Sequence, residues 1–193
     1  NFVSGGYQVS EHEVSVENTL ISNGFLKSKI KKITKLQLKK ALNGGDIPEL
    51  KEGEYISQPT GKNSSPDFIV RYNGKLYFIE CKSSNKTYPV YNGGLPGEEY
   101  IYIFTSKETN ETTIFYGKDV LKSEKRELYS KLLVELNQIL HKYQNMPKWE
   151  DKSRGFDYYI RNMYTQNGSA EKTNYFKHEG RLICEQNVLN SIR

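Results

Sequence analysis

Three charged side chains, Asp67, Glu80 and Lys82, have the types and the spacing that suit chemistry on a phosphate. Between the first two lies Asn73-Gly74, a strong signal for a two-residue hairpin turn. Counting outward from this turn places Asp67 directly opposite Glu80, and opposed residues of paired strands point to the same face. Lys82 follows Glu80 by two residues and shares that face. The sequence therefore predicts two carboxylates and an ammonium group together at one end of a hairpin.

Two opposed carboxylates repel each other, so this arrangement needs a positive charge to offset them. A divalent cation supplies it, and carboxylate oxygens completed by water and phosphate are the ligands that Mg²⁺ prefers. A bound cation lowers the pKa of a water ligand and neutralises charge on an attacked phosphate. The pattern favours Mg²⁺ as the cofactor, with Lys82 orienting the water or stabilising the developing charge. The competing interpretation is a plain hairpin whose charges are solvated neighbours.

The elements that must position these residues follow from hydrophobic patterning. Strands are expected at 54–58, 67–72, 75–82, 100–105 and 112–116. Helices are expected at about 10–23, 26–42, 119–144 and 184–192, the last after a mixed tail of loops or short strands. This order predicts an α/β domain with a central mixed β-sheet flanked by helices.

Three of the expected helices carry further signals. In the first, Ser10 and Glu13 have the spacing of a capping box, and Gly24 ends the helix. The second carries seven lysines, which we interpret as a solvated face rather than a contact to nucleic acid. The long helix over 119–144 repeats leucine every four residues, which indicates an amphipathic helix.

Composition limits the class of protein. The chain has 193 residues, enough for one domain with a proper core, and a net charge of +5 that modestly favours a polyanionic partner. No apolar run approaches the roughly 20 residues of a membrane span, and residues 1–7 lack a secretory signal pattern. Cys81 and Cys184 are too few for a disulfide scaffold, and with three scattered histidines they make no zinc pattern. We therefore expect a cytoplasmic protein with no membrane contact.

Pro66-Asp67 followed by Glu80-Cys81-Lys82 resembles the signature of the PD-(D/E)XK nuclease superfamily. The resemblance implies a restriction-endonuclease-like core in which Asp67, Glu80 and the backbone carbonyl of Cys81 bind Mg²⁺, while Lys82 assists the attacking water. It also implies an acidic residue on the first helix. Glu13 matches that position, Glu17 competes for it, and a capping-box role for Glu13 remains the alternative.

The loop after the catalytic lysine resembles that of type II restriction endonucleases. Residues 88–96 hold a proline, an aromatic residue and Asn92 before a second proline, and the resemblance places this loop near the scissile strand. It implies double-stranded DNA as substrate and a cognate DNA methyltransferase. Because each chain offers one cutting centre and a duplex has two strands, we expect a homodimer. The whole chain, 1–193, is then a single nuclease domain with a catalytic core at about 10–146.

The C-terminal segment, about 147–193, interleaves aromatic residues with arginine, asparagine and glutamine, which suit base edges and phosphates. We expect it to contact DNA through four residues in particular: Arg154, Tyr158, Arg161 and Gln166. A strand packed on the core is the alternative for any single one of them.

Three functions compete. The first is a Mg²⁺-dependent type II restriction endonuclease that cleaves a specific double-stranded sequence. The second is a structure-specific or repair nuclease of the same superfamily, such as a Holliday-junction resolvase. The third is a basic DNA-binding module without catalysis, whose hairpin is merely salt-bridged.

Overall fold

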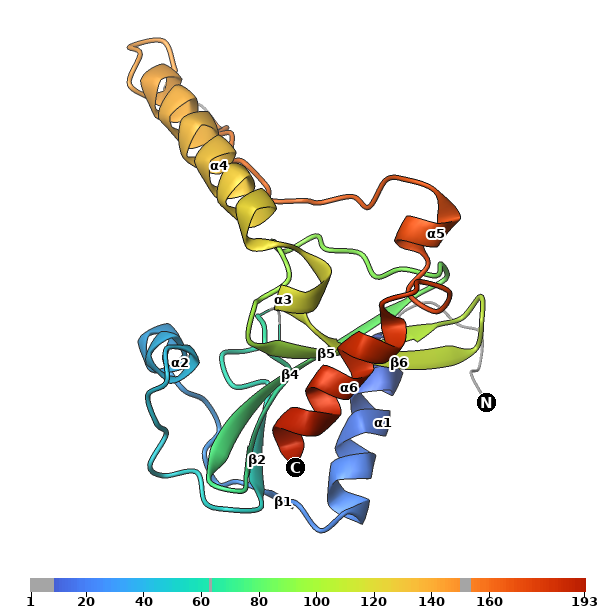
Figure 1. The fold of residues 1–193 in the computed structure, drawn as a ribbon. Coiled ribbons are helices and arrows are strands. Elements are labelled where there is room, and N and C mark those ends of the chain that lie inside the picture. Colours follow the sequence, from blue (N-terminus) through green and yellow to red (C-terminus); the bar gives the residue numbers. More distant parts are fainter. Residues whose placement is uncertain (1–8, 63, 150–153) are drawn as a thin grey trace.

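A six-stranded mixed sheet forms the centre of the computed structural model, which describes residues 9–62, 64–149 and 154–193 (Figure 1). Its strands are β1 (Leu26–Lys27), β2 (Glu54–Ser57), β3 (Phe68–Tyr72), β4 (Lys75–Ser84), β5 (Tyr100–Ser106) and β6 (Glu111–Tyr116), and they lie in this order. β2, β3 and β4 run antiparallel, β4 and β5 run parallel, and β6 returns antiparallel to β5. The predicted α/β architecture, a mixed sheet flanked by helices, is confirmed.

The flanking helices are α1 (Val9–Ser22), α2 (Lys35–Leu42), α3 (Gly117–Val120), α4 (Ser123–Gln144), α5 (Ala170–Thr173) and α6 (Arg181–Ile192). α1 packs Val16 and Leu20 on one sheet face, in a cluster that includes the Cys81 side chain. α2 packs Leu38 on the opposite face, in a cluster that includes Phe78. Alternation along β4 therefore directs Glu80 and Lys82 to the face that α2 covers. None of the described helices is both long and apolar enough to cross a bilayer.

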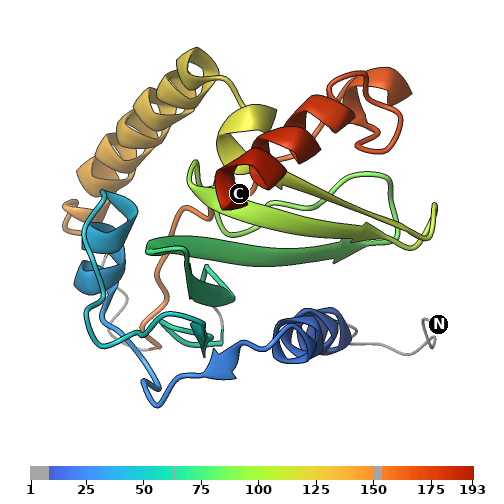
Figure 2. The same ribbon diagram turned by 60° about the horizontal axis from the view of Figure 1, so that its bottom comes forward.

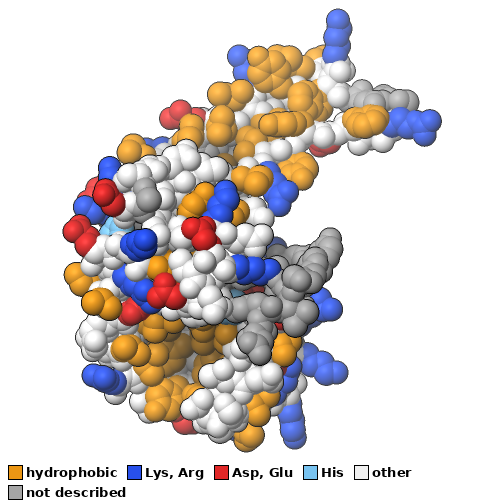
Figure 3. Space-filling model, turned by 90° about the vertical axis from the view of Figure 1, so that its right-hand side faces the viewer, with side chains coloured by type: hydrophobic (Ala, Val, Ile, Leu, Met, Phe, Trp, Pro, Cys, Tyr) orange, Lys and Arg blue, Asp and Glu red, His pale blue; other side chains and the backbone are white. Residues whose placement is uncertain are grey.

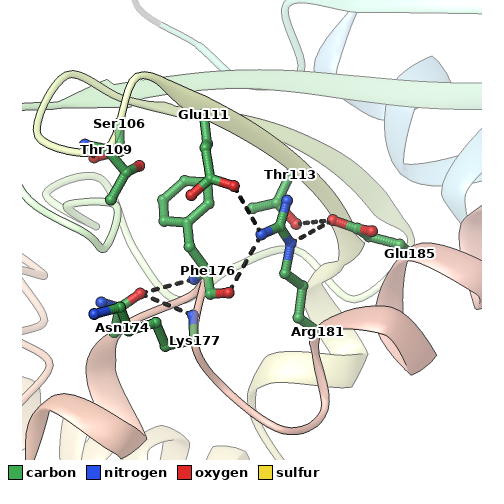
Figure 4. Close-up of polar contacts among 9 residues, drawn as sticks. All are labelled: Ser106, Thr109, Glu111, Thr113, Asn174, Phe176, Lys177, Arg181 and Glu185. Atoms are coloured by element: carbon green, nitrogen blue, oxygen red, sulfur yellow. Dashed lines mark hydrogen bonds and ion pairs between the residues drawn. The ribbon is translucent and has the colours of Figure 1, made fainter.

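α6 packs against β6, whereas α1 packs chiefly against β4 (Figure 2). Polar contacts fix the N-terminal turn of α6 to the edge strand (Figure 4). Arg181 donates from Nη1 to Glu111 at 3.2 Å and from Nε to Glu185 at 2.9 Å, and Glu185 also accepts from the Thr113 hydroxyl at 2.8 Å. The last helix is thus held over the side chains of the edge strand β6.

The β3–β4 hairpin forms as its sequence predicts. Asn73 and Gly74 have φ angles of 51° and 69°, and positive φ at both central residues is what a type I′ turn requires. The register then pairs Tyr72 with Lys75 and, at the far end, Phe68 with Ile79. The turn chemistry therefore sets which side chains face each other at the open end of the hairpin.

The helix expected over 26–42 is wrong in its first half. Leu26 and Ser28 donate backbone hydrogen bonds to Gly53 and Tyr55, so this segment pairs with β2 instead of coiling. α2 begins only at Lys35, where Thr34 forms a capping box with Gln37. The capping box at Thr34 and the pairing of Leu26–Lys27 with β2 together outweigh the apolar spacing that favours a longer helix.

Other expectations change less. The helix expected over 119–144 is divided into α3 and α4, and none of the residues of α4 is buried. The final helix, expected at 184–192, is confirmed as α6. α1 begins at Val9 and therefore includes Ser10. The side chain of Ser10 and residues 1–7 lie outside the part of the chain that the structure describes. The described part of the C-terminal segment before α5, residues 154–169, contains no helix and only a single β-bridge, at Tyr164.

Candidate functional site

Asp67, Glu80 and Lys82 come together at the open end of the β3–β4 hairpin. The β3–β4 ladder ends at the Phe68–Ile79 pair, and Asp67 and Glu80 are the residues next beyond it on the two chain segments. The Nζ of Lys82 lies 2.7 Å from Oε1 of Glu80. Asp67 is 8% exposed and Glu80 is 4% exposed, so both acids are buried. The predicted convergence of two carboxylates and one ammonium group is confirmed.

The Asp67 carboxylate is held by donors on both of its oxygens. Oδ2 accepts from the backbone N–H of Cys81 at 2.7 Å, and Oδ1 accepts from Nε2 of Gln58 at 3.1 Å. The Asp67 N–H in turn donates to the carbonyl of Ile79 at 2.9 Å. This acid therefore has a fixed orientation, as a catalytic ligand requires.

The environment of the site disfavours ionisation of all of its acidic side chains at once. Burial, and after it the charge of Glu80, raise the pKa of Asp67 to about 7. Burial likewise raises the pKa of Glu13. The backbone donor from Cys81 and the Lys82 ammonium act in the opposite direction on the pKa of Asp67, but they do not outweigh burial and repulsion. A further positive charge would therefore stabilise the ionised site.

Glu13 reaches the site through Gln58, whereas Glu17 is engaged elsewhere. The Gln58 Nε2 that donates to Asp67 also donates to Oε2 of Glu13 at 2.7 Å. Glu17 instead accepts from Lys27 at 2.8 Å and from the Tyr55 hydroxyl at 2.9 Å. Of the two acids proposed on the first helix, the geometry associates Glu13 with Asp67 and Glu80.

Gln58 is the site residue that the sequence patterns did not identify. It directly follows β2, with a φ of 50°, and its backbone N–H donates to the carbonyl of Asp67 at 2.7 Å. The available signal was positional, because Gln58 ends the segment expected as the strand next to Asp67. A glutamine in that place carries no chemical pattern of its own, so only the fold reveals its two carboxylate partners.

A cavity of about 490 Å³ opens beside the two β4 residues. Glu80 and Lys82 line it together with glycines of the loop after β4, the end of α2 and Arg126 of α4. Asn92, predicted to contact DNA, is an exposed residue of that loop between two lining residues, Tyr91 and Gly93. The cavity thus brings the acid and amine side chains within reach of a ligand from solvent.

The other predicted DNA contacts lie apart from the buried acids. Arg154, Tyr158 and Arg161 are exposed in the segment that follows α4. Gln166 is half-buried and donates from Nε2 to the carbonyl of Pro89 at 2.9 Å, so it supports the loop that carries Asn92. The β-bridge between Tyr91 and Tyr164 holds the same loop.

The oxygen ligands present would suit a cation that takes its remaining ligands from backbone carbonyl groups, water or phosphate. Within the described residues no three His, Cys, Asp or Glu side chains converge closely enough to hold a metal alone. Two acids do converge, however, and Oε2 of Glu80 is buried without a hydrogen-bond partner in the described part of the chain. The Cys81 thiol packs in the core, so the backbone carbonyl oxygen is the one ligand atom that Cys81 can offer at the site.

Comparison of the chain with protein-family models, curated proteins and solved structures gave no match. What the site can do therefore has to follow from its own groups: two buried carboxylates, an ammonium group and an adjoining cavity.

Proposed function

We propose that the protein is a Mg²⁺-dependent endonuclease of the PD-(D/E)XK type that cleaves double-stranded DNA at a specific sequence, as type II restriction enzymes do. The observation that carries the proposal is the juxtaposition of Asp67 and Glu80 at the open end of a hairpin, with Lys82 2.7 Å from Glu80. Burial of both acids supports a functional site, because a solvated surface hairpin would not confine like charges in this way.

Asp67, Glu80 and the backbone carbonyl of Cys81 are the groups that would hold Mg²⁺. When bound, Mg²⁺ supplies Lewis-acid activation of water and charge neutralisation at the phosphate. The raised pKa of Asp67 and the unpartnered Oε2 of Glu80 fit this role, since both indicate negative charge that lacks compensation in the described residues. Glu13 adds a further acid behind Gln58.

Lys82 supplies the positive group at the cavity. Its ammonium carries three donors, of which one is directed to Glu80 at 2.7 Å. The remaining donors are available to orient an attacking water or to stabilise charge that develops on a phosphate oxygen. Since Lys82 is on the same strand as Glu80, the sheet fixes their spacing and the side chain needs little reorganisation.

Several surface features support DNA as the substrate. The chain carries a net charge of +5, which modestly favours a polyanionic partner. Asn92, Arg154, Tyr158 and Arg161 are exposed and suited to base edges and phosphates. Each chain offers one cutting centre, so a homodimer would cut both strands of a duplex.

The free thiols of Cys81 and Cys184 fit a reducing compartment, and we place the protein in the cytoplasm on that basis. A partner DNA methyltransferase would be needed to protect host DNA if the cleavage is sequence-specific.

Digestion of long double-stranded DNA of known sequence, with Mg²⁺ or with a chelator, tests the proposal. We expect discrete fragments whose ends share one sequence, and no cutting with the chelator. Fragments with unrelated ends would contradict sequence specificity and favour a structure-specific nuclease. Binding without any cutting would contradict catalysis altogether.

A further inference from the structure

α4 is a helix of 22 residues that projects from the body of the molecule, and none of its residues is buried (Figure 1). Hydrophobic side chains nevertheless gather along this projecting arm (Figure 3). Leu132 is 49% exposed, Ile139 is 55% exposed and Tyr143 is 49% exposed. An amphipathic helix normally buries its apolar stripe, so this one lacks a covering surface within the described chain.

The exposed apolar residues follow a coiled-coil pattern. Positions alternately four and three residues apart are all apolar and exposed from Leu132 to just past the end of α4: Leu132, Leu136, Ile139, Tyr143 and Met146. An unbroken alternation of this kind is the seam of paired helices, in which side chains of one helix insert between those of another. Val134, although also exposed, lies on the opposite side of the helix.

A second copy of the chain fits this seam in area. The exposed apolar side chains along the seam and the flanking Leu128 amount to roughly 600 Å² per copy, or roughly 1,200 Å² for a pair, which reaches the lower bound of stable specific interfaces. One stripe that pairs with itself about a twofold axis is also the simplest closed assembly, because the same surface serves both copies.

Charge favours an antiparallel pair. If Leu136 of one copy packs against Ile139 of the other, the twofold axis crosses α4 between these residues. Glu135 of each copy then lies beside Lys142 of the second copy, so the seam is flanked by two ion pairs. In a parallel pair the residue beside Glu135 would be Leu140, which offers no partner charge.

From these observations we infer that two copies of the chain associate through an antiparallel pair of α4 helices, with the exposed apolar residues from Leu132 to Met146 forming the seam and Glu135 paired with Lys142 of the second copy. This dimer does not depend on the proposed nuclease activity, because the seam lies outside the Asp67–Glu80 site. Loss of the dimer would therefore leave the Asp67–Glu80 cutting centre standing, and absence of cleavage would leave the dimer standing.

Sedimentation equilibrium of the full chain tests the seam. The wild type is expected to be dimeric at micromolar concentration, and Ile139→Glu should raise the dissociation constant at least tenfold, by a rough estimate for burying an unpaired charge. Val134→Glu is the matched control, since it places the same charge on the same helix away from the seam. A monomeric wild type, or equal weakening by both variants at unchanged helical circular dichroism, would overturn the dimer.

Exchanging the charges of Glu135 and Lys142 tests the antiparallel orientation and leaves the apolar residues of the seam unchanged. Glu135→Lys and Lys142→Glu should each weaken association by placing like charges together. The double variant should restore the wild-type dissociation constant, because both ion pairs re-form with their signs reversed. Additive weakening in the double variant would overturn the antiparallel pairing.

Discussion

The ammonium of Lys82 lies 2.7 Å from one oxygen of Glu80, while the other oxygen of that carboxylate is buried without a hydrogen-bond partner in the described chain. A carboxylate satisfied on one side only is costly in a protein interior. The unpaired oxygen is therefore the point at which a cation would contribute most, and the predictions below follow from this imbalance.

Asp67 should make the metal-free protein less stable as pH rises. Its pKa is about 7 in the folded protein against an ordinary value of 3.8, so between these values the unfolded chain is ionised while the folded chain holds its proton. The stability contributed by protonated Asp67 is complete below about pH 3.8 and is lost as pH rises through about 7. The full loss is on the order of 4 kcal/mol, or roughly 8–16 °C in melting temperature.

Asp67→Asn should remove most of that loss when melting temperatures at pH 5 and pH 8 are compared without metal. Asp46→Asn is the control, because Arg71 lowers the pKa of Asp46, so this surface acid is ionised at both pH values and its removal should leave the difference between pH 5 and pH 8 unchanged. Mg²⁺ at pH 8 should stabilise the wild type but not the Asp67 variant. Equal pH dependence in the wild type and Asp67→Asn would contradict the crowded-acid site.

Glu13 and Glu17 lie one turn apart on α1. Substitutions at these two residues should distinguish an effect on Mg²⁺ affinity from an effect on stability. Glu13→Gln removes an acid that adds to the negative charge around Asp67, so the apparent affinity for Mg²⁺ in cleavage should fall roughly tenfold. Glu17→Gln loses contacts with Lys27 and Tyr55 and should change stability slightly without changing this affinity. Metal titration of the cleavage rate distinguishes the two, and the reverse ranking would assign the role to Glu17.

Gln58 acts as a positioning residue, because its amide donates to both Glu13 and Asp67. Gln58→Leu should raise the pKa of Asp67 further, since a donor to the ionised form is lost. The pH at which the cleavage rate reaches half of its maximum should therefore move upward, while DNA affinity at that pH stays the same. A lower rate with an unchanged pH midpoint would indicate only general disturbance of the fold.

The sequence predicts the hairpin part of the site because a two-residue turn fixes the register of both strands. Once Asn73-Gly74 is recognised, the opposition of Asp67 and Glu80 follows by counting, and the structure has the counted register as far as the neighbouring Phe68–Ile79 pair. The strands β2, β5 and β6 are likewise predicted by the alternation of residue types along their own segments. These features depend on neighbours in sequence, so patterning suffices to find them.

The features that sequence patterns miss depend on distant partners. Leu26–Lys27 becomes a strand because β2 offers backbone groups to it, which no local signal reveals. Gln58 joins the site because α1 brings Glu13 to it, and the two residues are 45 positions apart. The leucine repeat of α4 was recognised as amphipathic, but spacing alone does not tell whether the chain itself covers the stripe.

The central claim is that two opposed acids and one lysine form a metal-dependent cutting centre. Its most direct test is the initial rate of DNA cleavage in Mg²⁺ by Glu80→Gln and Lys82→Ala, with DNA affinity measured alongside. Both variants should lose roughly 100-fold or more in rate while still binding DNA, whereas Lys75→Ala on the same strand should cut like the wild type. Undiminished cleavage by Glu80→Gln or Lys82→Ala would contradict the assignment of the active site.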